Sequence, residues 1–168
     1  MRRYNRCMNA RWKPNVTVAA IVERAGRFLF VEEETEAGLA LNQPAGHLDE
    51  GESLIEACAR ETFEETGWRF RPQVLVGIYL WPRPDGVLTY LRFAFAGELL
   101  DHEAQQPLDE GIVRTLWLSR DGLIANRARH RSPLVLQCVD DYLAGRRHAL
   151  DLIRHWPMNR TEPQTWHR

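Results

Sequence analysis

The chain has 168 residues, of which 44% are apolar and 27% are charged, and its formal net charge at pH 7 is −1. This length and composition indicate one globular domain with a full hydrophobic core, and they exclude a disordered chain. The balanced charge argues against a nucleic-acid partner, because binding along a phosphate backbone needs a basic surface.

The cysteines and the hydrophobic profile indicate the setting of the protein. Cys7, Cys58 and Cys138 form no Cys-x-x-Cys pair and leave one odd thiol, which favours a reduced, cytoplasmic environment. The longest apolar run, residues 16–22, is too short to span a membrane. We expect a soluble monomer or homodimer with no membrane partner.

The two ends of the chain differ in composition from its centre. Residues 1–13 are basic but lack the apolar stretch of a secretion signal, so they are expected to form an N-terminal extension. Residues 157–168 are polar and are expected to form a C-terminal tail. The folded domain is therefore expected over residues 14–156.

Apolar alternation and turn residues predict the order of elements along the chain. Strands and helices together indicate an α/β (α+β) fold with a mixed sheet. Strands are predicted over 15–23, 27–33, 39–43, 74–81, 87–99 and 111–118, with turns at 25–26, 44–46 and 82–86 and helices from 53, 119 and 132.

The helix that starts at residue 53 has signals at both ends. Ser53-Leu-Ile-Glu56 matches a capping box, in which each side chain bonds the other residue's backbone N–H. Gly67 is a suitable C-cap because glycine adopts the left-handed conformation at little cost. The sequence therefore predicts a helix between these residues.

Three carboxylates gather near the end of this helix. Glu61, Glu64 and Glu65 stand at positions i, i+3 and i+4 and so share one flank, where like charges repel. Glu61 and Glu65 border the apolar stripe that contains Thr62. Arg60 can neutralise one carboxylate but not three, so a hard divalent cation is the expected counter-charge. The alternative is a solvated acidic surface.

These carboxylates belong to a longer pattern. Residues 46–67 read Gly-x5-Glu-x7-Arg-Glu-x2-Glu-Glu-x-Gly, followed by an apolar Trp68. This pattern resembles the Nudix box. Thr62 departs from it, because the family usually has an aliphatic residue there, and the change is expected to affect packing rather than metal binding.

The resemblance implies a Nudix-type α/β/α sandwich and hydrolysis at a phosphoanhydride with Mg²⁺, or Mn²⁺ in its place. A metal-bound water would attack phosphorus. By the same resemblance, Glu61, Glu64, Glu65 and the Gly46 carbonyl would ligate the metal, Arg60 would orient the catalytic glutamates, Glu61 is a candidate base, and Glu52 and Gly67 would have structural roles.

The resemblance extends outside the box to one bacterial branch, the NudJ-type phosphatases. That branch releases phosphate from nucleoside tri- and diphosphates and acts on thiamine pyrophosphate and its hydroxymethylpyrimidine precursor. The stretches that resemble it are residues 13–18, 31–33, 42–47, 91–93 and 131–135.

Three arginines outside the box are candidate phosphate contacts. Arg27, Arg92 and Arg131 carry guanidinium forks that match phosphate oxygens. Arg92 interrupts an otherwise apolar strand, on the same side as Tyr90 and Ala94. A solvent-facing arginine explains that position equally well.

Four further residues are candidate substrate contacts. Tyr79 and Trp81 are able to stack on a base, although packing in the core explains them as well. His47 follows the box glycine and is placed to contact phosphate or to cap the loop. Glu110 precedes a strand, with Asp109 beside it, where some Nudix enzymes have another acidic ligand or base.

Two other functions fit the same motif. The first is a pyrophosphatase acting on ADP-ribose or another nucleoside diphosphate-X, for which Pro82 is a one-residue match. The second is a Nudix-fold binding module without catalysis, although such modules usually lose box carboxylates that this chain keeps. RNA cap removal is disfavoured by the neutral charge.

Overall fold

The computed structural model describes residues 12–156. The predicted C-terminal tail and nearly all of the N-terminal extension lie outside these residues. Among the described residues, no helix is both long and apolar enough to cross a membrane.

The first of two sheets has the strand order β5-β1-β7-β6 and carries one side of the site. It is mixed, because β1 runs parallel to β7 and antiparallel to β5, while β6 and β7 form a long antiparallel hairpin. Its strands are β5 (Ala45–His47), β1 (Asn15–Ile21), β7 (Thr89–His102) and β6 (Trp68–Pro82).

The second sheet is antiparallel and centres on β3, which pairs with β2, β4 and β8. The predicted turn between β2 and β3 is confirmed. Ala25 and Gly26 both have positive φ, at 51° and 74°, which suits a tight hairpin. The strands are β2 (Glu23–Arg24), β3 (Arg27–Thr35), β4 (Gly38–Asn42) and β8 (Ile112–Ser119).

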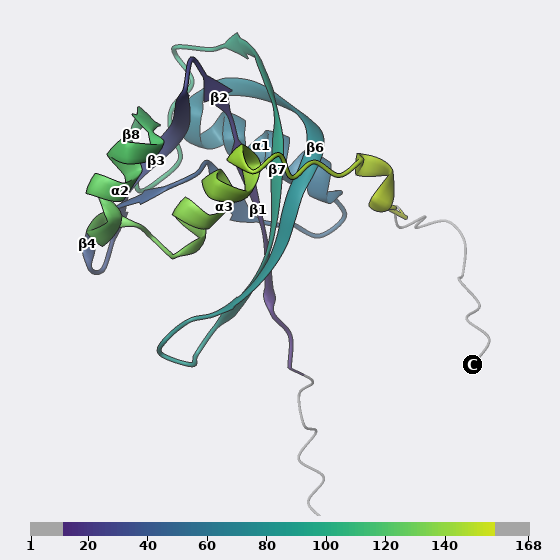
Figure 1. Cartoon of the computed structure of the whole chain (residues 1–168). Coiled ribbons are helices and arrows are strands. Elements are labelled where there is room, and N and C mark those ends of the chain that lie inside the picture. The colour runs from purple at the N-terminus through teal and green to yellow at the C-terminus, as the bar shows by residue number, and fades with distance from the viewer. Residues whose placement is uncertain (1–11, 157–168) are drawn as a thin grey trace, which may run out of the picture.

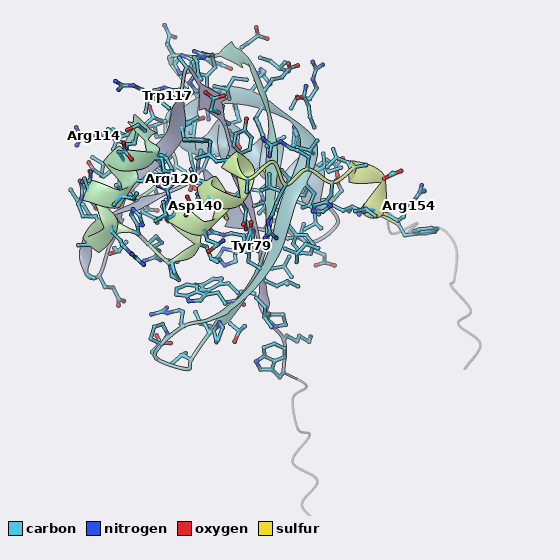
Figure 2. The ribbon with its side chains drawn as sticks, viewed as in Figure 1. Tyr79, Arg114, Trp117, Arg120, Asp140 and Arg154 are labelled. Carbon is cyan, nitrogen blue, oxygen red and sulfur yellow. The ribbon has the colours of Figure 1, made fainter. Side chains whose placement is uncertain are left out.

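Helices cover both faces of the central strands (Figure 1). The helix α1 (Leu54–Thr66) lies behind β1, β7 and β6 in this view, and α3 (Leu134–Leu143) lies in front of them. The short helix α2 (Arg120–Ala125) packs beside α3, and the Arg120–Asp140 ion pair joins the two (Figure 2). The 3₁₀ helices are η1 (Arg127–Arg129) and η2 (Leu150–Leu152).

The hydrophobic core is divided by the central strands into two clusters. On β1, Val18 and Ala20 pack toward Cys58 of α1, while Ile21 packs toward Val135 of α3. Each strand residue therefore faces one helical layer, as the apolar character of both faces of this segment predicts. The α/β/α sandwich with a mixed sheet is confirmed.

The predicted caps of α1 are both present. The Ser53 hydroxyl accepts from the Glu56 N–H at 3.2 Å, and Glu56 accepts from the Ser53 N–H at 2.8 Å. Gly67 adopts φ 70°, and its N–H donates to the Phe63 carbonyl at 2.8 Å. These local bonds set where the helix begins and ends.

Several predicted strand ends are wrong by two or three residues, and two boundaries differ in ways that have a clear cause. Residues 45–47 form β5 rather than part of a turn, because Gly46 pairs with Val18 and the Ala20 N–H donates to the Pro44 carbonyl at 2.8 Å. The strand β6 begins at Trp68, six residues before its predicted start. A register shift beside Pro72 accommodates the missing N–H, so the proline interrupts the ladder without ending the strand.

Substitution of Ser53 by alanine tests the contribution of the N-cap. We expect the free energy of unfolding to fall by about 1 kcal/mol, because a backbone N–H of α1 loses its acceptor. Urea denaturation measures the change. The exposed Glu50→Gln is the control and should stay within about 0.5 kcal/mol of wild type. An unchanged Ser53→Ala midpoint would show that water replaces the cap fully.

Candidate active site

The helix α1 presses two carboxylates against the strand β5. Glu61 and Glu65 are only 8% and 7% exposed, although both lie in the last two turns of the helix. The approach is so close that a Cβ on Gly46 would lie 2.0 Å from the Glu61 carboxyl carbon. A larger residue here would therefore displace the Glu61 carboxylate from β5, and this effect is one of space, since the φ of Gly46 is not positive.

Burial changes the acidity of both carboxylates. Desolvation raises the pKa of Glu65 to about 9, and the nearby charges of Glu61, Glu33 and Asp109 act in the same direction. The Ala45 N–H donates to Glu65 Oε2 at 2.8 Å and opposes this rise. Burial also raises the pKa of Glu61, and the bond from Arg60 opposes that rise. Glu65 has no ion pair within residues 12–156, so its ionised form is the less stabilised of the two.

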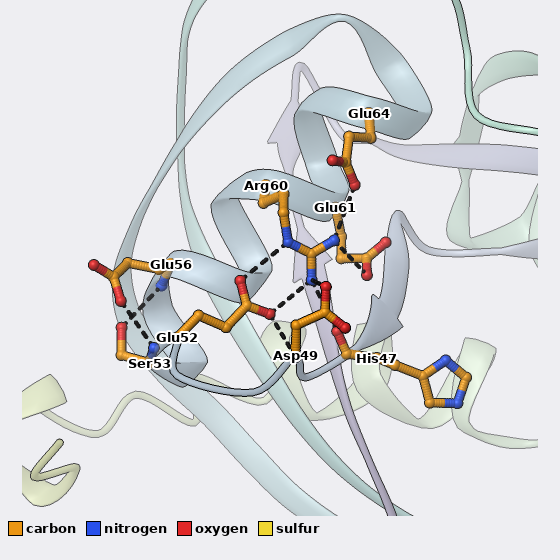
Figure 3. A network of polar contacts seen from close by, with 8 residues as sticks. All are labelled: His47, Asp49, Glu52, Ser53, Glu56, Arg60, Glu61 and Glu64. Carbon is orange, nitrogen blue, oxygen red and sulfur yellow. Dashed lines mark hydrogen bonds and ion pairs between the residues drawn. The ribbon is translucent and has the colours of Figure 1, made fainter. Parts of the chain in front are cut away.

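Arg60 connects the loop before α1 to the acidic flank of the helix (Figure 3). Its Nε and Nη2 donate to the two oxygens of Glu52 at 3.0 and 2.7 Å. Its Nη1 donates to Glu61 and to Glu64, at 2.9 Å in each case. Its Nη2 also donates to the His47 carbonyl at 3.0 Å. One guanidinium therefore positions two of the three box glutamates and the segment that follows Gly46.

The donor set matches a hard divalent cation. Glu61 and Glu65 bring two buried carboxylates to the Gly46 backbone, and carboxylate and carbonyl oxygens are the ligands that Mg²⁺ accepts. No three His, Cys, Asp or Glu side chains between residues 12 and 156 are grouped closely enough to hold a metal as they stand. Glu64 is directed to Arg60, so rotation of its side chain would be needed to complete the set.

A cavity of about 380 Å³ opens beside these carboxylates. The first sheet, the second sheet, α1 and the segment that enters α3 all contribute to its walls. Acidic, basic and aromatic side chains are therefore combined in one space. Its lining residues are Thr17, Glu33, Asn42, Ala45, Gly46, His47, Glu61, Glu65, Trp81, Arg83, Tyr90, Arg92, Asp109, Arg131, Ser132 and Leu134.

Four of the candidate substrate residues line this cavity. His47, Trp81, Arg92 and Arg131 come from four separate segments of the chain. Arg92 is buried, at 8% exposure, so the solvent-facing alternative does not apply. Trp81 stacks on Tyr90 with ring centroids 5.9 Å apart and an interplanar angle of 16°. The pair presents an aromatic surface to the cavity.

Three candidate residues do not line the cavity. Arg27 pairs with Ser119 at the far end of β3, about 20 Å along the strand from Glu33. Tyr79 lies against α3, where its hydroxyl donates to Asp141 at 2.9 Å (Figure 2). Glu110 is exposed, and its neighbour Asp109 takes the place beside the carboxylates.

Several lining residues were missing from the sequence-based set of site residues. Thr17 is a polar residue within the apolar segment of β1, and this exception to the pattern could have identified it from the sequence. Tyr90 pairs with Trp81 only through the register of the β6–β7 hairpin. Asp109 is placed by its N–H, which donates to the Glu64 carbonyl at 3.0 Å. The last two depend on long-range contacts that no local pattern reveals.

Comparison with known proteins defines the class. The model of the NUDIX domain matches residues 12–137, so the chain belongs to the Nudix family. Phosphatase NudJ of Escherichia coli strain K12 is 40% identical over 151 residues, which cover 89% of this chain and 97% of that protein. Phosphatase NudJ of Shigella flexneri has the same values.

Solved structures agree with this assignment. A NUDIX hydrolase from Nitrosomonas europaea is 50% identical, covers 86% of this chain and 98% of its own, and has a TM-score of 0.84. A UDP-X diphosphatase covers 86% of this chain and 70% of its own, with a TM-score of 0.66 at 20% identity, and shows the fold alone. The chain is a Nudix hydrolase and a homologue of NudJ phosphatases. Members of this family generally use divalent metal ions.

The buried Glu65 predicts how metal-free stability depends on pH. Because its native pKa is raised to about 9 from an ordinary 4.5, the native state keeps a proton that the unfolded state releases between these values. The free energy of unfolding should therefore fall as pH rises toward 9, by up to about 1.4 kcal/mol per pH unit from this group. Urea denaturation with EDTA measures the slope.

Glu65→Gln removes the titrating group and should make this slope shallower. The matched control, Glu50→Gln, alters an exposed carboxylate outside the cavity and should reproduce the wild-type slope. Parallel curves for wild type and Glu65→Gln would contradict the prediction.

Proposed function

We propose that this chain is a Mg²⁺-dependent hydrolase of phosphoanhydrides that releases phosphate from nucleoside tri- and diphosphates or from thiamine and thiamine-precursor pyrophosphates. The observation that carries the proposal is the composition of one cavity. Glu61 and Glu65 lie in its wall, Arg131 supplies positive charge, and the Trp81–Tyr90 pair supplies an aromatic face.

The cavity combines the three requirements of such a substrate. A pyrophosphate needs cations, and guanidinium groups bind phosphate oxygens in a fork. A nucleobase or pyrimidine ring needs a flat apolar surface, which stacked Trp81 and Tyr90 offer. Hydrolysis needs a cation site next to the phosphates, for which the carboxylates of Glu61, Glu64 and Glu65 and the Gly46 carbonyl are the candidates.

The chain's own residues prepare the chemistry. Bound Mg²⁺ supplies charge neutralisation on phosphate oxygens and a water molecule of lowered pKa. Arg60 donates to Glu61 and Glu64 and so positions them, and its bond to Glu52 fixes the guanidinium itself. Glu61 is a candidate to accept the proton of the attacking water, because its second carboxylate oxygen is free of Arg60.

The free cysteines bear on the cellular location of the enzyme. We propose a cytoplasmic location and a monomer or homodimer. Cys58 and Cys138 are both free thiols in the core, which suits a reducing compartment.

A hydrolysis panel with identified products tests the proposal. Nucleoside tri- and diphosphates, thiamine pyrophosphate and ADP-ribose are incubated with Mg²⁺, with Mn²⁺ and with EDTA. We expect free phosphate from the first two classes only when metal is present. Glu65→Gln should lower kcat/KM at least about 100-fold, because a ligand carboxylate is lost. It should also abolish the rise in melting temperature that Mg²⁺ causes in wild type.

The panel also separates the rival functions. AMP and ribose 5-phosphate from ADP-ribose, without free phosphate from nucleotides, would support a nucleoside diphosphate-X pyrophosphatase. Binding of nucleotides without metal-dependent turnover would support a binding module. Glu34→Gln is the control variant, since Glu34 is an exposed carboxylate outside the cavity and should leave turnover unchanged.

A further inference from the structure

The cavity contains an unusual concentration of unsatisfied polar atoms. Within residues 12–156, four buried side-chain atoms lack a hydrogen-bond partner: Thr17 Oγ1, Glu33 Oε1, Arg92 Nε and Ser132 Oγ. All four belong to residues that line this one cavity. Buried polar atoms are normally paired, because leaving one unpaired costs free energy. Their placement together indicates that a ligand completes them.

Arg92 offers a fixed hydrogen-bond donor. Its Nη1 donates weakly to two amide oxygens, Asn42 Oδ1 at 3.4 Å and Gln43 Oε1 at 3.5 Å. Gln43 is itself anchored by donation to the Val135 carbonyl at 2.7 Å. Within residues 12–156, no carboxylate accepts a hydrogen bond from this guanidinium, so it is held by neutral groups and its Nε–H is unused.

Glu33 offers a hydrogen-bond acceptor in the same wall. Its Oε1 lies 3.4 Å from Arg131 Nε as an ion pair, but it accepts no hydrogen bond. Its side chain is 19% exposed. Glu33 and Arg92 are near enough for each charge to shift the other's pKa. A donor and an acceptor therefore stand in one region of the cavity.

This combination selects among ligand groups. A phosphate would suit Arg92 but would meet the negative charge of Glu33, whereas a neutral ring edge avoids that repulsion. In a ring such as cytosine, the unprotonated ring nitrogen accepts from a guanidinium, and the exocyclic amino group beside it donates to a carboxylate. The hydroxyls of Thr17 and Ser132 can pair with a donor or with an acceptor on the ring, because a hydroxyl both donates and accepts hydrogen bonds. Trp81 and Tyr90 offer the surface on which such a ring stacks.

We propose that Glu33 and Arg92 form a specificity site that recognises the amino edge of a nitrogen heterocycle in the substrate, with Thr17 and Ser132 completing the contacts. The proposal rests on the proposed function in that the same cavity holds the phosphates. It adds a selection for amino-substituted rings, such as cytosine, over rings such as uracil, in which an oxo group replaces the amino group and the adjacent ring nitrogen carries a hydrogen.

The test compares CTP with UTP, which differ at this edge. We expect wild type to favour CTP in kcat/KM by at least about tenfold, because uracil in the same pose directs an acceptor at the Glu33 carboxylate and an N–H donor at the Arg92 guanidinium. Glu33→Gln retains the size of the side chain but adds a donor, so the CTP preference should fall about tenfold, mainly through KM. Glu34→Gln, one residue along β3 and outside the cavity, should keep the wild-type ratio.

Equilibrium binding separates this inference from the hydrolase proposal. Calorimetric titration with CMP and UMP needs no phosphoanhydride, and we expect tighter binding of CMP to wild type and equal binding to Glu33→Gln. A melting temperature like that of wild type shows that the variant is folded. Thr17→Val, which removes one hydroxyl, should weaken CMP binding in the same assay.

The outcomes are distinct. Equal use and equal binding of the two nucleotides by wild type, or an unchanged ratio in Glu33→Gln, would overturn the amino-edge site while phosphate release still supports the hydrolase. Selective CMP binding without turnover would support the site and contradict the hydrolase. Failure of wild type to bind either monophosphate would also overturn the site.

Discussion

The candidate active site depends on the burial of two carboxylates against β5. Glu61 lies against Gly46, where a single added methyl group would overlap its carboxyl, and Glu65 accepts from the neighbouring Ala45 N–H. Burial of like charges is unfavourable unless a positive charge offsets it. A divalent cation bound here would supply the positive charge that Glu65 lacks and would add to that of Arg60 at Glu61.

The rest of the fold maintains this unfavourable arrangement. The caps at Ser53 and Gly67 set the ends of α1, and the pairing of Gly46 with Val18 sets the height of β5 on the sheet. Arg60 then joins the two by bonding Glu52, Glu61 and the His47 carbonyl. Since a guanidinium is rigid and planar, these bonds fix the position of the loop relative to the acidic flank of α1.

The opposite wall of the cavity is built by different means. Arg92 and Trp81 come from the β6–β7 hairpin, Glu33 comes from the second sheet, and Ser132 comes from the segment before α3. Their side chains meet because both sheets border the same space. The metal side is thus specified within one continuous motif, whereas the substrate side is assembled from four distant segments. This division explains how one family retains its chemistry while its substrates vary.

The sequence by itself determined the helix α1, its caps, the box carboxylates and the burial of both faces of β1, because each depends on residues within a few positions of one another. Tertiary structure decided the features that depend on contacts between distant segments of the chain. Pairing with β1 converts a Pro-Ala-Gly turn into β5, and the length of β3 carries Arg27 away from the cavity. The register of β6 with β7 brings Trp81 onto Tyr90, and loop geometry selects Asp109 over Glu110. Long-range pairing sets these positions, and it can be known only once the sheets have formed.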